Sequence, residues 1–232
     1  MKKYTNPTKG FTLVELMVTL AVMGIMAAIA FPSMSNFIAN TRLTNRAGQV
    51  ANLFRFAKGE AVRLGVPVVV CGVKVRTDGR PSGVCSPSSV SSGMMAYADN
   101  NKNGMYDDGT DVMLRSVSIN GNDSPEKMTV EVNKCKVDGT GCTTDSIVEY
   151  VFFANGMYGS KKVARTTQTN LVNNVEVAQS FLRVRIKDVQ RTSLAARNTI
   201  VAPSGAAATC QTGSTSNVAD GFSAIMKTVC DS

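Results

Sequence analysis

One carboxylate, Glu15, lies in a run from Phe11 to Phe31 that is otherwise uncharged and mainly apolar. The run is long enough to cross a bilayer as a helix. A carboxylate inside such a helix costs roughly 2–3 kcal/mol or more if it stays unpaired, so a cation is expected at the same depth. The sequence therefore predicts a functional charge pair that uses Glu15.

The order of segments indicates where that cation comes from. An ordinary secretory signal places its apolar run before the cleavage site and loses it. Here a cut between Gly10 and Phe11 keeps the run and creates a free amine on Phe11. Within one subunit this amine and Glu15 pair poorly, whereas a neighbour shifted by about one helical turn brings its own amine alongside. The residues thus indicate self-assembly of parallel helices.

The chemistry at the N-terminus needs a long helix to position it. Beyond Pro32 an amphipathic pattern continues to Leu64, and Gly65 and Pro67 are typical of a helix end. Apolar residues recur at spacings of three and four. They are Leu43, Ala47, Val50, Phe54, Ala57, Ala61 and Leu64. We expect one helix over 11–64, about 80 Å long.

The remainder, 65–232, is predicted to be a β-rich head. Segments that are β-branched or alternate in polarity predict strands. These segments are 68–70, 128–132, 147–153, 181–187 and 199–202. The predicted organisation is a leader over 1–10, a transmembrane or filament-core helix over 11–31, its amphipathic continuation over 32–64, and the head. The fold class is α+β, a long helix packed on antiparallel sheets.

The charge balance does not indicate a dedicated nucleic-acid binder. The formal charge of the 232 residues is +8. Removing the three leader lysines from the 25 basic side chains leaves 22 against 17 acidic ones, a net charge of +5. Those leader lysines are expected to keep the N-terminus cytoplasmic and the head on the other side of the membrane, although Arg42 and Arg46 beyond the apolar run weaken this argument.

Six cysteines and no histidine fit an exported head. An even cysteine count in a translocated domain indicates disulfides, and no pair has the spacing of a zinc site. Six cysteines allow 15 connectivities. We adopt pairing in sequence order, which gives Cys71–Cys85, Cys135–Cys142 and Cys210–Cys230.

Two weaker patterns could bind ligands. Oxygen-bearing side chains at Asp99, Asn101, Asn103 and Asp107, with Asp111 close by, copy the first part of a calcium-binding EF-hand loop. The bidentate glutamate of that loop is missing, and a hydrated turn is the favoured interpretation. In the strand 181–187, the side chains of Arg183, Arg185 and Lys187 are predicted to form one basic face and to contact nucleic acid weakly.

Catalysis has little support in the sequence. Without histidine there is no histidine-based dyad or triad. No Gly-x-Ser-x-Gly motif and no glycine-rich phosphate loop occurs. We predict a non-enzyme that has no cofactor, with calcium as the one candidate ion.

The segment Gly10-Phe11-Thr12-Leu13-Val14-Glu15 resembles the cleavage and methylation motif of type IV prepilins and type II secretion pseudopilins. The resemblance implies cutting after Gly10 by an inner-membrane prepilin peptidase and N-methylation of Phe11. It also implies that Glu15 helps to dock the subunit into a filament, in agreement with the charge pair inferred above.

The head is similar to the FimU/FimT minor pilins and the related GspH pseudopilins. The similarity lies in Gly59 to Cys71 and in Ala196 to Gly205. The branch that takes up DNA carries a Gly-Arg-x-Arg pattern after that last turn. Here both arginine positions are alanine, Ala206 and Ala208. The segment 120–142 has no counterpart in these families.

The resemblance implies a FimU-like minor pilin that joins a complex priming pilus assembly and lies near the tip. The alternatives are a FimT-like DNA-uptake pilin and a GspH-like type II secretion pseudopilin. Expected partners are other minor pilins, the major pilin, the prepilin peptidase and the assembly machinery, with DNA binding weak or absent. The expected location is the inner membrane with the head in the periplasm, and then the pilus.

Overall fold

The computed structural model describes residues 10–122, 126–138, 141–162, 171–213 and 224–231, apart from the side chains of 29–33, 172 and 224–225. The chain divides into two units, Met1–Asn40 and Thr41–Ser232. The second unit, called the head below, contains both sheets. The predicted leader lies outside the described residues except for Gly10.

One helix, α1, runs from Leu13 to Leu64. Its sequence is rich in Leu, Met and Ala, which have high helix propensity. Gly65 follows it in the left-handed conformation with φ +71°, which a side chain would disfavour. The single long helix expected over 11–64 is therefore confirmed, with its first turn starting at Leu13.

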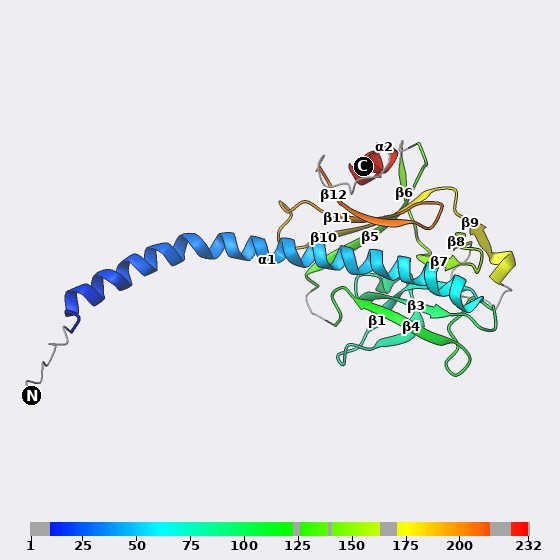
Figure 1. Ribbon diagram of the computed structural model, residues 1–232, viewed down its shortest axis with the longest axis horizontal. Coiled ribbons are helices and arrows are strands. Elements are labelled where there is room, and N and C mark those ends of the chain that lie inside the picture. The colour runs from blue at the N-terminus through cyan, green and yellow to red at the C-terminus, as the bar shows by residue number, and fades with distance from the viewer. Residues whose placement is uncertain (1–9, 123–125, 139–140, 163–170, 214–223, 232) are drawn as a thin grey trace, which may run out of the picture. The chain divides into compact units, whose positions relative to one another are not determined.

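Strands of the head form two antiparallel sheets (Figure 1). The larger sheet has the order β4 (Val112–Ser118), β3 (Gly93–Ala98), β1 (Val68–Val75), β7 (Glu149–Phe152), β8 (Tyr158–Lys161) and β9 (Val175–Val177), and β2 (Pro81–Cys85) also pairs with β1. Two short 3-10 turns, η1 (Pro87–Ser89) and η2 (Leu171–Asn174), lie in its connections.

The smaller sheet has five strands in the order β12 (Ala207–Gln211), β11 (Arg197–Val201), β10 (Phe181–Asp188), β5 (Met128–Cys135) and β6 (Cys142–Thr144). A short C-terminal helix, α2 (Ala224–Asp231), contacts β10, β11 and β12 of this sheet. The expected α+β class is confirmed, and each strand predicted from sequence overlaps a strand of the structure.

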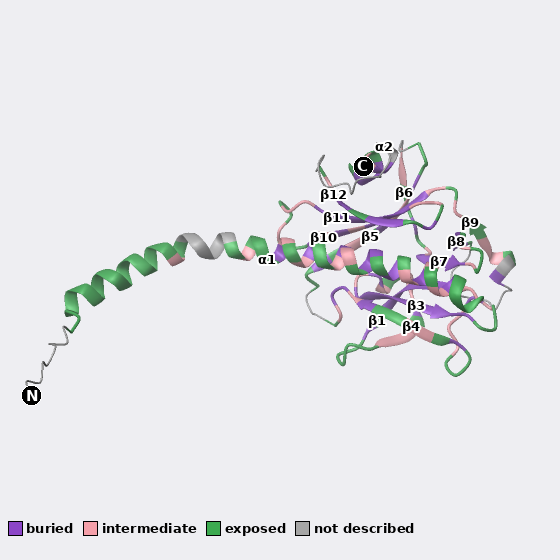
Figure 2. Ribbon diagram, viewed as in Figure 1, coloured by how far each residue is buried: buried purple, intermediate pink, exposed green. Residues whose placement is uncertain are grey.

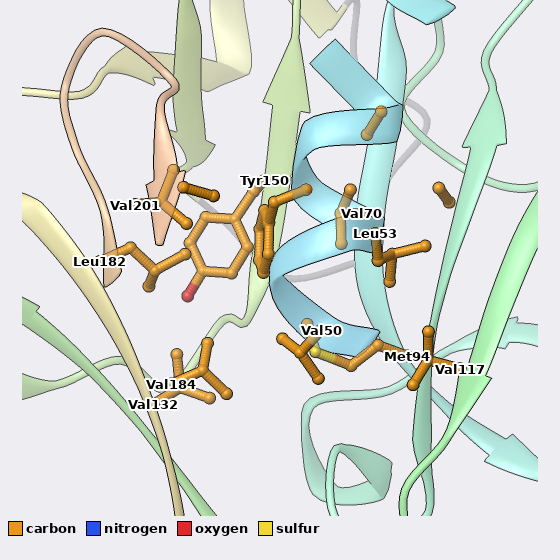
Figure 3. Close-up of a cluster of buried hydrophobic side chains, with 14 of the residues drawn as sticks. Val50, Leu53, Val70, Met94, Val117, Val132, Tyr150, Leu182, Val184 and Val201 are labelled. Carbon is orange, nitrogen blue, oxygen red and sulfur yellow. The ribbon is translucent and has the colours of Figure 1, made fainter. Parts of the chain in front are cut away.

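The two sheets share one core, which forms around residues 41–64 of α1. Figure 3 shows Leu182 and Val184 of the smaller sheet and Val70 and Met94 of the larger sheet on either side of the helix. Phe54 on α1 packs against two aromatic side chains of β7, Tyr150 at 5.9 Å and Phe152 at 6.3 Å between ring centroids. The helix therefore joins both sheets into one packed unit.

The buried stripe of α1 is the predicted one with two differences. Figure 2 shows this part of α1 alternating between buried and exposed residues. Leu43, Ala47, Val50, Phe54, Ala57 and Ala61 are at most 1% exposed, whereas Leu64 is 37% exposed. Ala51 and Leu53, which the pattern omitted, are completely buried. Both sheets contact this part of the helix, so more of its surface is buried than the predicted stripe.

Candidate functional site

The N-terminal residues with predicted chemistry lie at the surface of the first unit. Gly10 and Phe11 precede α1, and Phe11 is 89% exposed. No heavy atom lies within 4 Å of the position that a Cβ on Gly10 would occupy. The fold itself therefore makes no steric demand for glycine at this position, and any such demand comes from a partner.

Glu15 and Thr12 form a capping box at the start of α1. The backbone N–H and the hydroxyl of Thr12 both donate to Glu15 Oε2 at 3.3 Å, and the Glu15 N–H donates to Thr12 Oγ1 at 3.2 Å. This reciprocal arrangement satisfies N–H groups that the first helical turn leaves without partners. The Thr-x-x-Glu spacing before an apolar run could have revealed it, but the sequence reasoning considered only docking.

The N-terminal part of α1 carries an extended apolar surface. Its large side chains are each 46 to 70% exposed, namely those of Leu13, Val14, Leu16, Met17, Val18, Leu20, Val22, Met23, Ile25, Met26, Met34, Phe37 and Ile38. An apolar surface of this extent is typical of a segment that contacts lipid or other protein chains.

Over the part of the chain that the structure describes, no helix reaches both the length and the apolar character needed to cross a membrane. The segment expected to do so, 11–31, includes 29–31, whose side chains lie outside the described residues. The membrane span therefore stays a prediction.

Three disulfides join the pairs expected from sequence order. Cys71–Cys85 links β1 to β2, and Cys135–Cys142 links β5 to β6. Cys210–Cys230 attaches α2 to β12, with 6.3 Å between the two Cα atoms. The last of these ties a helix that the sequence analysis did not predict to the face of the smaller sheet.

The residues proposed to hold calcium come together in the turn 99–111 between β3 and β4. Asp99 accepts hydrogen bonds from the backbone N–H groups of Asn103 at 3.2 Å and Gly104 at 2.8 Å. Asp111 accepts from the N–H groups of Asn100 and Asp107, both at 2.9 Å. The turn is thus closed by its own hydrogen bonds.

Carboxylates of this turn have different electrostatic environments. Burial raises the pKa of Asp99, whereas the side-chain amides of Asn101 and Asn103 donate to Asp107 and lower its pKa. Among the described residues, no group of three or more His, Cys, Asp or Glu side chains is arranged to hold a metal ion. A calcium ion would need oxygens that the turn already uses, and calcium binding stays a prediction.

A buried ion pair that the sequence did not predict is hydrogen-bonded to the turn 99–111. Lys161 on β8 and Glu149 on β7 are 3% and 1% exposed and form a direct salt bridge. Lys161 Nζ also donates to the Gly104 carbonyl at 2.7 Å, and the Tyr97 hydroxyl donates to the same carbonyl at 3.2 Å. A side chain on Gly104 would come within 2.9 Å of Leu171, so glycine is required there.

The predicted basic face on β10 is only partly exposed, and its contact with nucleic acid stays a prediction. Arg183 is 4% exposed because α2 covers it, and its guanidinium donates to the Val229 carbonyl of that helix at 3.1 Å. Burial lowers the pKa of Arg183 to about 10. Arg185 donates to Asn198, and Lys187 forms an ion pair with Glu131 at 2.7 Å.

Around the turn 202–206, this chain has Ala206 and Ala208 where DNA-uptake relatives carry arginines. Ala206 is exposed, but Ala208 is only 6% exposed, so a large side chain at 208 would disturb the packing. From α1, Arg55 Nε donates to the Ala207 carbonyl at 2.9 Å and Lys58 Nζ to the Ser204 carbonyl at 2.7 Å. These helix cations hold the turn in place.

A capped, exposed apolar helix joined to a disulfide-bonded antiparallel head defines a pilin-like subunit. Residues 5–31 match the prokaryotic N-terminal methylation motif. Residues 46–171, more than half of the 232, match the family described as type II transport protein GspH. The chain therefore belongs to the GspH family and carries the methylation motif of pilins.

Several curated pilins are similar to shorter parts of the chain. A type IV major alpha-pilin of Moraxella bovis is 46% identical over 46 residues, 20% of this chain and 29% of that protein. A fimbrial protein of Pseudomonas aeruginosa is 41% identical over 61 residues, 26% of this chain and 39% of its own length. The type IV major pilin protein PilE1 of Neisseria gonorrhoeae is 33% identical over 81 residues, 35% of this chain and 34% of its own.

The chain thus spans between 29% and 39% of the length of these relatives. No solved structure matches the chain.

Proposed function

We propose that this chain is a minor pilin of the type IV pilus, similar to FimU, which joins other minor pilins in a complex that primes assembly and lies near the tip. In this role it is a structural, non-enzymatic subunit. A prepilin peptidase cuts after Gly10, Phe11 is N-methylated, and the helix waits in the inner membrane with the head in the periplasm. The subunit then enters the filament.

The observation that carries this proposal is the exposed apolar surface of α1 directly behind the cleavage motif. Thirteen large apolar side chains between Leu13 and Ile38 are half exposed or nearly so. This surface contacts lipid before assembly, and packing against the helices of other pilins would keep it out of water in the filament. Glu15, which is hydrogen-bonded to its own Thr12, would exchange that partner for the Phe11 amine of a neighbour.

A type II secretion pseudopilin is the second candidate because the matching family is described as type II transport protein GspH. Both roles use the same processing and the same helix. A DNA-uptake role is less favoured because Arg183 is covered and the turn at 206 lacks arginine.

Deleting the gene in its native host separates these roles. We expect surface pili, counted by electron microscopy and in sheared fractions, to fall sharply while secretion of exported enzymes continues. Loss of secretion with normal piliation would instead assign the chain to the secretion system. Loss of DNA uptake with normal pili would assign it to transformation.

Complementation tests the N-terminal chemistry in the same strain. Gly10→Val should accumulate as full-length precursor and fail to restore pili. Glu15→Val should be cleaved normally yet enter pili poorly, because its partner on the neighbouring helix is lost. Mature-size Gly10→Val in normal amount, or full piliation by Glu15→Val, would contradict the proposed processing and docking.

A further inference from the structure

One end of the head can be identified by strand direction. Strand β11 runs beside the first turns of α1 in the head, since Arg197 Nε donates to Thr44 Oγ1 and Thr199 Oγ1 donates to the Ala47 carbonyl, both at 2.9 Å. The connection 189–196, which leads into β11, therefore lies at the end of the head where α1 enters. We call this the Thr41 end.

Two further connections lie at the same end. Asp188 at the end of β10 pairs with Met128 at the start of β5, so the connection 119–127 before β5 is there too. The Asn120 side chain donates to the carbonyls of Met128 and Ser91, which joins the larger sheet to this end. Strand β1 starts just after α1 ends and runs back, so its turn 76–80 also lies there (Figure 1).

The Thr41 end is basic. Gln211 at the end of β12 pairs with Arg197, so 212–213 and Asp231, which accepts from the Gly213 N–H, lie at this end too. The described residues in 41–46, 74–80, 119–122, 126–127, 188–196 and 212–213, together with Asp231, include seven basic and four acidic side chains, a net charge of +3. The basic ones are Arg42, Arg46, Lys74, Arg76, Arg80, Lys127 and Arg191. Lys74, Arg76 and Arg80 on the β1–β2 hairpin are exposed.

Three of the acidic side chains at this end accept backbone hydrogen bonds. Asp78 accepts from the Arg80 N–H, Asp231 accepts from the Gly213 N–H, and Asp188, which is 4% exposed, accepts from the N–H groups of Gln190 and Arg191. At the opposite end of the head, the turn 99–111 carries four aspartates and one lysine. The Thr41 end, which is joined through the chain to the segment 11–31, is therefore positive, whereas this turn at the opposite end is negative.

We infer that the Thr41 end binds the anionic headgroups of a phospholipid bilayer and holds the head on the membrane surface before assembly. The inference rests on the membrane span at 11–31 in the proposed function. Only nine residues of the chain, 32–40, separate that segment from the head. Exposed cations interact with a charged surface over about one Debye length, roughly 10 Å at physiological salt.

This surface also accounts for Arg42 and Arg46, which lie on the translocated side against the usual charge bias of membrane proteins. A DNA duplex offers the same phosphate chemistry, but nothing in the chain holds DNA next to the Thr41 end. The turn that carries arginines in DNA-uptake relatives, 202–206, follows β11 and lies at the other end of the head.

The test uses the full mature chain in nanodiscs of neutral phosphatidylcholine, or of phosphatidylcholine mixed with phosphatidylglycerol. Backbone hydrogen exchange in 76–80, read by mass spectrometry, should be slower in the anionic discs. Each cation near an anionic surface contributes about a fivefold preference, so Arg76→Glu with Arg80→Glu should abolish the difference. The matched control, Lys102→Glu with Lys136→Glu, changes exposed lysines at the opposite end and should keep it.

Equal exchange in the two kinds of disc would overturn the inference. It would also be overturned if a short DNA duplex protected 76–80 more strongly than anionic discs at equal phosphate concentration, which would assign the surface to nucleic acid.

Alkaline extraction from neutral vesicles tests the membrane span separately. A chain that is extracted, yet is protected at 76–80 by anionic vesicles, refutes the span and supports the lipid surface. A chain that resists extraction but shows equal exchange supports the span and refutes the lipid surface.

Discussion

Glu15 has an intramolecular partner and a proposed intermolecular one. In the structure its carboxylate accepts two hydrogen bonds from Thr12, so the charge is already partly satisfied before any neighbour arrives. Docking on a neighbour's amine would exchange neutral donors for a charged one, and charge-assisted hydrogen bonds are stronger. Thr12 is therefore a positioning residue for Glu15.

Thr12→Ala should lower incorporation of the subunit into pili without altering its cleavage. Losing a threonine N-cap costs about 1 kcal/mol of helix stability and frees the Glu15 carboxylate from its fixed rotamer. Immunoblots of membrane and sheared-pilus fractions measure the effect. Thr12→Ser keeps the hydroxyl and should restore assembly, so an equal defect in both variants would argue against the cap.

Lys161→Met should lower the free energy of unfolding of the head by about 3–5 kcal/mol, because Glu149 is left as an unpaired buried charge. The double variant with Glu149→Leu should recover much of that loss. Urea unfolding of the three proteins makes the comparison. A double variant as unstable as Lys161→Met would show that the hydrogen bond to Gly104, and not the ion pair, is what matters.

Asp107 should contribute to acid sensitivity of the turn 99–111. The amides of Asn101 and Asn103 lower its pKa in the folded protein, so its stabilising effect is complete above the unfolded-state value and is lost as pH falls through the folded-state value. Asp107→Asn should therefore differ from wild type near neutral pH and converge with it in acid. Chemical unfolding over a pH series checks this, with Asp108→Asn as the control, and a constant difference at every pH would contradict it.

Helix α2 covers part of the smaller sheet and buries Arg183 on it. It is only eight residues long and is fixed by Cys210–Cys230, by Arg183 donating to the Val229 carbonyl and by Asn198 donating to the Cys230 carbonyl. Isolated helices of this length are not stable in water. Its structure therefore depends on these attachments and on packing against Phe181 and Ile200.

Replacing Cys210 and Cys230 with serine should cost about 3 kcal/mol and raise hydrogen exchange across 224–231. Arg183 should become accessible to solvent in the same variant. The Cys135–Cys142 disulfide closes a shorter loop. Replacing these two cysteines with serine should therefore cost only about 2 kcal/mol and should leave hydrogen exchange across 224–231 unchanged. Unchanged protection of α2 after loss of Cys210–Cys230 would show that packing alone holds it.

For the whole molecule, the positions of the charged side chains, and not the net charge, decide which of them can bind a partner. Without residues 1–10 the side chains carry a net charge of +5, but Arg183 is covered and Lys187 is paired, whereas Lys74, Arg76 and Arg80 are exposed at the Thr41 end. One apolar core joins α1 to both sheets, so the head should unfold as a single cooperative unit.

We expect the full chain in neutral nanodiscs to bind a short DNA duplex only weakly, no better than about 10⁻⁴–10⁻⁶ M at physiological salt, and more strongly at low salt. The reason is that a basic surface without base contacts binds through counterion release alone. A fluorescence titration over a salt series measures this. Tight binding near physiological salt would make DNA uptake the leading function.

Local signals in the sequence determined the helix over 13–64, its buried stripe and the position of the processing and docking residues. Helical periodicity and a glycine stop depend on neighbours within one or two turns, so they can be read from the chain. The Thr12–Glu15 cap was equally local and could have been found. Pairing of the cysteines in sequence order also agrees with short connections between neighbouring strands.

Tertiary structure alone decided which predicted polar groups are accessible and which are buried. Alternation correctly placed Arg183, Arg185 and Lys187 on one face of β10, but it could not show that α2 covers Arg183. Lys161 and Glu149 lie on adjacent strands, and their salt bridge offsets the cost of burying both charges. Strand β3, built from Gly, Met, Ala and Tyr, lacked a β-branched pattern and formed because β1 and β4 pair with it on both sides. Burial and pairing of this kind depend on contacts between distant segments, and local sequence carries no record of them.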